Sequence, residues 1–170
     1  EEYPLTVEIF DSAGNRTEER QIISVDIFAT KKDGKLIIEV SSLLFAPDSA
    51  EFTDFGRYSD FYEGQKEKNM KILDQIARML DQYKDYSILI EGHGVLVNWD
   101  TPELAEREQK EELIPLTKAR AEAVKAALVE RGIPSERIST VGVGGANPAY
   151  PFRDRENRWK NRRVTFILEK

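Results

Sequence analysis

The stretches LTKARAEAVKAALVERGI (residues 116–133) and RWKNRRVTF (158–166) decide the fold of this chain. In the first stretch, apolar residues recur at three- and four-residue spacing, which predicts an α-helix with one buried face. Thr117 is the expected N-cap of this helix, Arg131 its last residue, and Gly132 its C-terminal stop. The second stretch leads from a basic loop into an apolar strand.

Working outward from these stretches, the chain alternates strands with helices. An earlier helix is predicted over residues 66–83, where apolar residues again form one stripe. Strands are predicted at 35–45, 86–94, 138–144 and 162–169. The order strand–helix–strand–helix–strand–strand is typical of an α/β (α+β) sandwich, in which helices cover one face of a mixed sheet.

A β-hairpin is expected before this domain. Residues 3–10 and 22–29 have strand patterns, and DSAGN at 11–15 is a turn signal. The hairpin resembles the last two strands of a bacterial Ig-like domain. It is interpreted either as the end of an upstream module or as a hairpin docked on the main domain, which gives a division into residues 1–30 and 31–170.

Composition and charge exclude several classes of function. The formal net charge of −6 argues against a general nucleic-acid binder, and the absence of cysteine excludes disulfides, thiolate nucleophiles and cysteine metal sites. No stretch approaches the roughly 20 apolar residues that span a bilayer. Residues 100–112 hold six acidic and two basic residues, whereas 153–163 hold six basic and two acidic. This separation suits either a zwitterionic ligand or two solvated loops.

Arg120 is the first candidate binding residue. It lies three residues after Thr117, where a capping box would place Glu, and a cation in the first turn opposes the helix dipole. Two explanations stay open: Arg120 and the free helix amides together bind a carboxylate, or Arg120 pairs with an acid of residues 100–112.

Several short motifs in this order closely resemble the OmpA-like C-terminal domain family, which includes peptidoglycan-associated lipoproteins and flagellar stator anchors. The resemblance covers roughly residues 35–170. The motifs are FAPDSAEF (45–52), IEGHG (90–94), the 116–133 helix, GVGGANP (142–148) and RWKNRRVTF (158–166).

The resemblance implies a ligand and a site. In the family, the arginine at the position of Arg120 holds the carboxylate of the diamino acid in the peptidoglycan stem, and an aspartate after the Gly-His pair takes its amine. Here Val95 replaces that aspartate, and Leu113 falls where the family has an asparagine. Either Asp100 or Glu103 folds back to replace the lost carboxylate, or the domain keeps the fold without ordinary wall binding.

The resemblance also implies that Asp48, Asn161 and one arginine of the Arg162–Arg163 pair line the ligand pocket. Strand alternation sends the two arginines to opposite faces, and Arg163 is the one expected in the pocket.

No catalytic site, metal site or cofactor is expected. His93 is the single histidine, and there is no nucleophile elbow, no metal pair and no phosphate-loop lysine in the glycine-rich GVGGANP.

The expected function is non-enzymatic, noncovalent binding of the peptidoglycan stem in the periplasm of a Gram-negative or spirochaete-like envelope. The module would tether the outer membrane, or an envelope protein, to the wall, with attachment to the outer membrane through a part outside this chain. The alternative is an OmpA-like fold retained as a structural or protein-interaction module, with other envelope proteins as partners.

Overall fold

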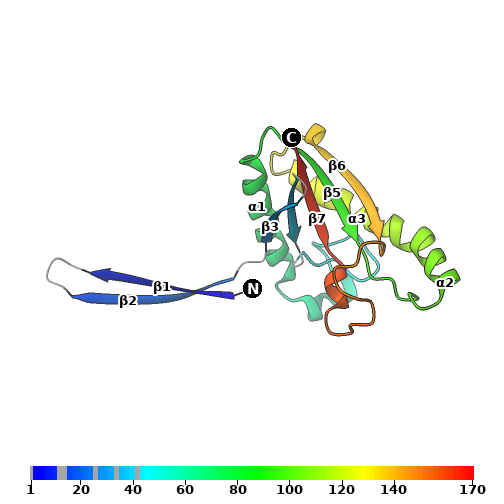
Figure 1. Ribbon diagram of the computed structural model, residues 1–170, viewed down its shortest axis with the longest axis horizontal. Coiled ribbons are helices and arrows are strands. Elements are labelled where there is room, and N and C mark those ends of the chain that lie inside the picture. Colours follow the sequence, from blue (N-terminus) through cyan, green and yellow to red (C-terminus); the bar gives the residue numbers. More distant parts are fainter. Residues whose placement is uncertain (1, 11–14, 25–26, 33–34, 41–42) are drawn as a thin grey trace.

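The computed structural model describes residues 2–10, 15–24, 27–32, 35–40 and 43–170 (Figure 1). Within this part of the chain no helix combines the length and apolar character needed to cross a membrane. The elements, in chain order, are β1 (Glu2–Phe10), β2 (Arg16–Ser24), β3 (Ile27–Lys32), β4 (Lys35–Val40), η1 (Gly56–Tyr62), α1 (Gln65–Asp81), β5 (Ser87–His93), α2 (Pro102–Arg107), η2 (Glu108–Leu113), α3 (Ile114–Val129), η3 (Ser135–Arg137), β6 (Ile138–Gly144), η4 (Arg158–Asn161) and β7 (Val164–Glu169).

The main sheet has five strands in the order β3-β4-β7-β5-β6. Strands β5 and β6 are parallel and joined through α3, whereas β7 runs antiparallel to both β4 and β5. The mixed sheet and its helices confirm the predicted α/β sandwich. Strand β3, which pairs with β4, is one more strand than the predicted order contained.

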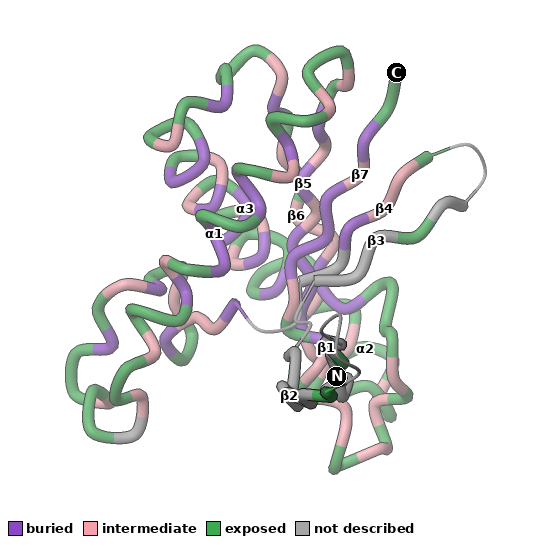
Figure 2. The backbone as a smooth tube through the Cα atoms, turned by 90° about the vertical axis from the view of Figure 1, so that its left-hand side faces the viewer, coloured by how far each residue is buried: buried purple, intermediate pink, exposed green. Residues whose placement is uncertain are grey.

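Helices α1 and α3 cover one face of the sheet, and the core lies between them and the strands (Figure 2). Strand β5 buries alternate residues, as expected for a strand that is covered on one face. The largest fully buried side chains are Phe166, Ile38, Leu43, Leu73, Ile76, Leu80, Ile88, Ile90, Leu128, Leu168 and Val124.

Strands β1 and β2 form a separate two-stranded sheet that extends away from the main sheet (Figure 1). The predicted pairing of residues 3–10 with 22–29 is wrong, because Phe10 pairs with Arg16 and the ladder ends at Ser24. The polar residues 16–21 lack an apolar pattern, but backbone pairing does not require one. Strand β3 crosses the predicted boundary at residue 30, and the division into two domains stays a prediction.

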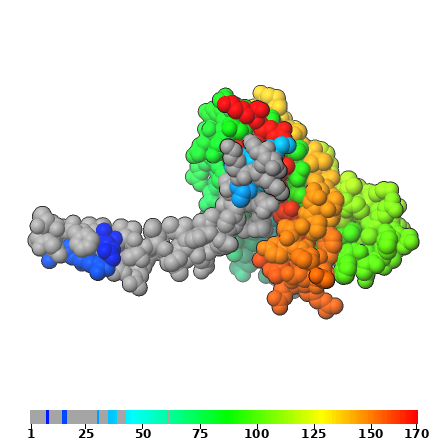
Figure 3. All heavy atoms as spheres, in the orientation of Figure 1, coloured from blue at the N-terminus to red at the C-terminus, as the bar shows by residue number. Residues whose placement is uncertain are grey.

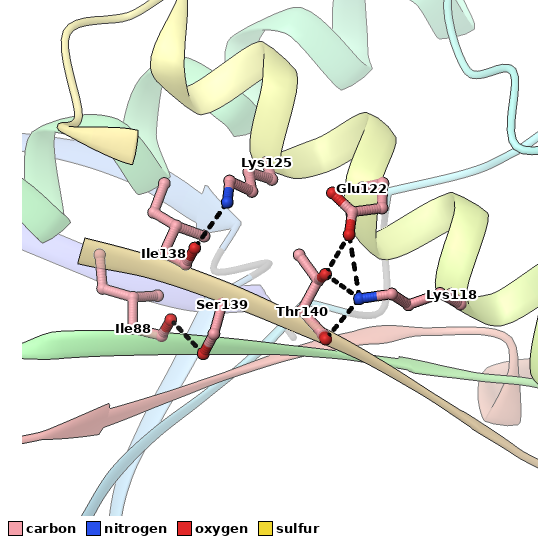
Figure 4. Close-up of polar contacts among 7 residues, drawn as sticks. All are labelled: Ile88, Lys118, Glu122, Lys125, Ile138, Ser139 and Thr140. Atoms are coloured by element: carbon pink, nitrogen blue, oxygen red, sulfur yellow. Dashed lines mark hydrogen bonds and ion pairs between the residues drawn. The ribbon is translucent and has the colours of Figure 1, made fainter. Parts of the chain in front are cut away.

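Strand β6 is an edge of the main sheet, and lysines of α3 reach over this edge (Figure 4). Lys118 Nζ donates to Thr140 O at 2.6 Å, and Lys125 Nζ donates to Ile138 O at 2.8 Å. These carbonyls would otherwise be open to pairing with another strand, so the lysines protect the edge.

Candidate functional site

The segment before α3 is helical rather than a loop. Helix α2, the π-helical turn η2 and α3 follow one another without interruption from Pro102 to Val129. The prediction that Thr117 is an N-cap is therefore wrong. Thr117 is buried within the helix, where its hydroxyl donates to Leu113 O at 2.7 Å. Arg120 consequently has no free helix amides beside it, and that part of the case for anion binding does not hold.

The π-helical turn has a local cause in Pro115. Proline has no N–H to donate, and its ring collides with the carbonyl of the fourth residue before it, Glu111, in a regular α-helix. A wider turn over Glu108–Leu113 lets the chain remain helical despite this proline. The turn also sets which acidic side chains face the same side as Arg120.

Glycines let this helix pass directly over the ends of two strands. A Cβ on Gly92 would lie 2.0 Å from Thr117 O, and a Cβ on Gly142 would lie 2.3 Å from Ile114 O. Only glycine permits such an approach of helix backbone to strand backbone. The close packing fixes the position of Arg120 relative to the sheet.

Arg120 is held by two groups from the segment after β4. Its Nε donates to Ser49 O at 2.9 Å, and its Cζ lies 5.1 Å from the centre of the Phe45 ring. Its Nη1 and Nη2 make no hydrogen bond to any described residue. The residue is 6% exposed and does not pair with an acid of residues 100–112. The remaining exposure lies toward a cleft.

The charge of Arg120 is affected by its surroundings. Burial and the nearby Arg162 guanidinium lower the pKa of Arg120 to about 10, whereas Asp48 acts in the opposite direction. Arg120 therefore remains cationic at neutral pH, next to a second cation and one carboxylate.

The cleft has a volume of about 700 Å³ and opens between the helical segment and the loop before β7. Figure 3 shows that loop, in orange, beside the green segment that contains α2. The cleft is lined by Pro47, Asp48, Gly94, Val95, Val97, Glu108, Glu112, Leu113, Leu116, Arg120, Arg155, Arg158, Trp159 and Arg162.

Carboxylates of the helical segment line the cleft, but they are not the expected ones. Asp100 and Glu103 are exposed and do not line it. Glu108 is buried, and its two oxygens accept three hydrogen bonds from Val97 and Asn98. Glu112 lines the cleft and makes no hydrogen bond or ion pair with the described residues. Glu112 is thus the carboxylate of this segment that is available to a ligand.

Asp48 lines the cleft and lies in a turn with φ of 48°. A left-handed conformation is uncommon for residues other than glycine, although aspartate tolerates it better than most. The turn is closed by a 2.7 Å hydrogen bond from Ala46 N to Glu51 O. It presents Asp48 and, through its carbonyl, Ser49 to the region of Arg120.

Val95 and Leu113 both line the cleft and give it an apolar wall. Neither can accept a hydrogen bond from an ammonium group. The wall therefore offers no acceptor at the two positions where the family pattern has polar side chains.

Two other expected site residues lie outside the cleft. Asn161 is fully buried, and its amide exchanges two hydrogen bonds with the backbone of Tyr150. Arg163, the arginine chosen from the sequence, donates from Nη2 to Asn147 O at 3.3 Å and does not line the cleft. Arg162 lines it instead. Strand β7 begins only at Val164, so strand alternation does not govern this arginine pair.

His93 follows Gly92 and so points to the sheet face opposite α3. It is 3% exposed, and Glu91 Oε2 lies 3.5 Å from its Nε2, beyond the usual hydrogen-bond distance. Burial, with the Arg163 charge, lowers the pKa of His93 to about 4. His93 is therefore neutral at physiological pH.

A family model described as the OmpA family matches residues 64–162. The peptidoglycan-associated lipoprotein of Brucella melitensis is 33% identical over 97 residues, which cover 56% of this chain and 51% of that protein. The peptidoglycan-binding protein ArfA of Mycobacterium bovis is 44% identical over 55 residues, which cover 32% of this chain and 17% of ArfA. The chain thus spans about half the length of the first relative and less of the second.

A solved structure has the same fold. The periplasmic domain of Helicobacter pylori MotB superposes with a TM-score of 0.63 at 22% identity, covering 96% of this chain and 87% of that one. At this identity the likeness extends to the fold alone.

Proposed function

Because the chain belongs to the OmpA family, we propose that it is a non-enzymatic periplasmic module that binds the peptide stem of peptidoglycan noncovalently. In the intact protein it tethers the outer membrane, or an envelope protein that carries it, to the cell wall. The names of two relatives, a peptidoglycan-associated lipoprotein and a peptidoglycan-binding protein, support this proposal.

The observation that carries the proposal is that one cleft is lined by both a cation, Arg120, and an anion, Glu112. A diamino acid in the stem ends in a carboxylate and an ammonium on the same carbon, and it needs a cation and an anion placed to match. Among the described residues, neither Nη atom of Arg120 has a hydrogen-bond partner, and neither does the Glu112 carboxylate.

The helix sets the separation between these two groups. Glu112, Leu116 and Arg120 follow at four-residue spacing, and all three line the cleft. Eight residues correspond to about 12 Å along a helix. Both side chains are long, so their charged ends can reach one amino-acid head group that rests on Leu116.

A second candidate function comes from the apolar wall of Val95 and Leu113. If Glu112 does not replace the missing carboxylate, a buried ammonium would face apolar groups, which is unfavourable. The domain would then serve as a structural or protein-interaction module in the envelope, without affinity for the wall.

Co-sedimentation with purified sacculi separates the two candidates. Under the proposal the wild-type protein sediments with sacculi, and Arg120→Ala abolishes this because the carboxylate loses its charged partner. Arg78→Ala, which removes an exposed arginine outside the cleft, should sediment like the wild type. Failure of the wild type to sediment would favour the second candidate.

Arg120 is buried, so its replacement could also impair folding. Thermal unfolding of each variant, followed by circular dichroism, identifies such a defect. Glu112→Gln provides an independent test at an exposed residue that makes no hydrogen bond to the residues described. Its sedimentation should weaken while its melting temperature stays unchanged.

A further inference from the structure

Three arginines from the loop before β7 face the same cleft. Arg155, Arg158 and Arg162 all line it, and within the described residues their guanidinium groups make no hydrogen bond or ion pair. Arginine at a protein surface commonly pairs with a nearby carboxylate, so three unpaired guanidinium groups at one cleft indicate an anionic ligand.

Asp154, the acid immediately before Arg155, is already bonded within the loop. Asp154 accepts hydrogen bonds from the backbone of Glu156 and Asn157 and from the Asn157 side chain. These bonds, above all the one from the Asn157 side chain, lower the pKa of Asp154. The carboxylate thus holds the loop in shape instead of neutralising Arg155 or Arg158.

The loop is also fixed at its far end. The buried Asn161 amide bonds to both backbone groups of Tyr150, and Lys160 Nζ lies 5.0 Å from the centre of the Tyr150 ring. Lys160 is therefore placed against an aromatic ring while its arginine neighbours line the cleft. A rigid loop presents charged groups at a lower entropic cost of binding.

The lining of the cleft carries more cations than anions. Four arginines line the cleft, together with three carboxylates, Asp48, Glu108 and Glu112. Glu108 already has three internal hydrogen bonds, and Arg162 lies near enough to Arg120 to lower its pKa. A ligand with one carboxylate and one ammonium would leave this excess in place.

We propose that Arg155 and Arg158 form a second anion subsite, which binds a carboxylate of the ligand other than the one held by Arg120. The proposal rests on the proposed function and names its substrate class: stem peptides with at least two free carboxylates. Amidation of the second carboxylate would weaken binding, since a neutral amide cannot accept the paired hydrogen bonds of an arginine as strongly.

The test uses three synthetic peptides and isothermal titration calorimetry. The parent is L-alanyl-γ-D-glutamyl-meso-diaminopimelate, and the derivatives carry a carboxamide at the glutamate α-carboxylate or at the C-terminal carboxylate. The wild type should bind one of the two amides at least about tenfold more weakly than the parent. This is the affinity expected to be lost when a charge-assisted hydrogen bond is removed. The double variant Arg155→Ala/Arg158→Ala should bind the parent as weakly as that amide and show no preference.

Arg153→Ala is the matched control, because Arg153 is exposed on the same loop and does not line the cleft. It should keep the wild-type preference. Equal binding of all three peptides by the wild type would overturn the second subsite while leaving the proposed function intact. Binding of none of them would overturn the proposed function, and the subsite with it.

Discussion

Arg120 Nε donates a 2.9 Å hydrogen bond to the backbone oxygen of Ser49, 71 residues earlier in the chain. The bond joins α3 to the turn that carries Asp48. Because Nε is used in this bond, Nη1 and Nη2 remain for an end-on contact with a carboxylate. The turn thereby orients Arg120 so that its Nη edge remains for a ligand carboxylate.

Replacing Arg120 by lysine tests this orientation. Arg120→Lys keeps the charge but loses both the bond to Ser49 and the two-pronged contact with a carboxylate. We expect affinity for the parent stem tripeptide to fall by about tenfold or more, measured by calorimetry. Wild-type affinity in this variant would mean that charge alone matters at this position.

Glu112→Gln tests the acceptor for the ammonium group. The substitution should weaken binding of the tripeptide by about tenfold, because a charge-assisted hydrogen bond becomes a neutral one. The tripeptide acetylated on the free amine of its diamino acid should bind the wild type and Glu112→Gln equally. A loss that is the same for both peptides would assign Glu112 another role.

Val95→Asp should compensate for the loss of Glu112. Val95 lines the cleft and is half-buried, so an aspartate there would again place a carboxylate opposite Arg120. We expect the double variant Val95→Asp/Glu112→Gln to recover most of the wild-type affinity in the same calorimetric assay. No recovery would show that position 95 lies out of reach of the ligand amine.

The sequence predicted the sandwich well because its signals are local. The α1 stripe, the strand over 138–144 and the apolar run before the C-terminus each depend on residues close in sequence. The sequence does not predict the helical segment before α3, because Pro115 would normally interrupt a helix there, whereas the wider π-helical turn accommodates it.

The site was predicted less completely than the fold. Arg120 and Asp48 could be named because they match family motifs. Glu112, Arg155 and Arg158 could not, since their orientation depends on the register of an uninterrupted helix and on a loop fixed by Asn161. The six basic residues between 153 and 163 were the one signal in the sequence that pointed to them.

His93 should make the stability of the domain depend on pH. Its pKa is about 4 in the folded chain, against an ordinary value of 6.5. Below pH 6.5 the unfolded chain takes up the proton first, so the free energy of unfolding falls until about pH 4 and is unaffected above 6.5. The loss over this window is on the order of 3 kcal/mol.

Urea unfolding at pH 7.5 and at pH 4.5 measures this difference. His93→Asn cannot titrate in the window, so it should lose less stability between the two pH values than the wild type does. An equal loss in both proteins would assign the pH dependence to other groups.

Gly142→Ala should destabilise the domain strongly. The added Cβ would lie 2.3 Å from Ile114 O and 2.6 Å from Lys118 N, and these backbone atoms of α3 cannot move independently. We expect the free energy of unfolding in urea to fall by about 2 kcal/mol or more. Gly94→Ala is a graded control, because its Cβ would lie 3.3 Å from side-chain methyl groups of Leu113 and Thr117, and its effect should be smaller.

Lys118 and Lys125 should protect the β6 edge from pairing with other chains. Their ammonium groups donate to Thr140 O and Ile138 O, and methionine at both positions would keep the length of the side chains but leave these carbonyls open. We expect Lys118→Met/Lys125→Met to unfold in urea with a free energy lower by about 1 kcal/mol per lysine. Light scattering after size-exclusion chromatography should also detect larger species as the protein concentration rises. Lys71→Met, an exposed change on α1, controls for the loss of surface charge. If both proteins have the same size distribution at every concentration, the lysines do not guard the edge.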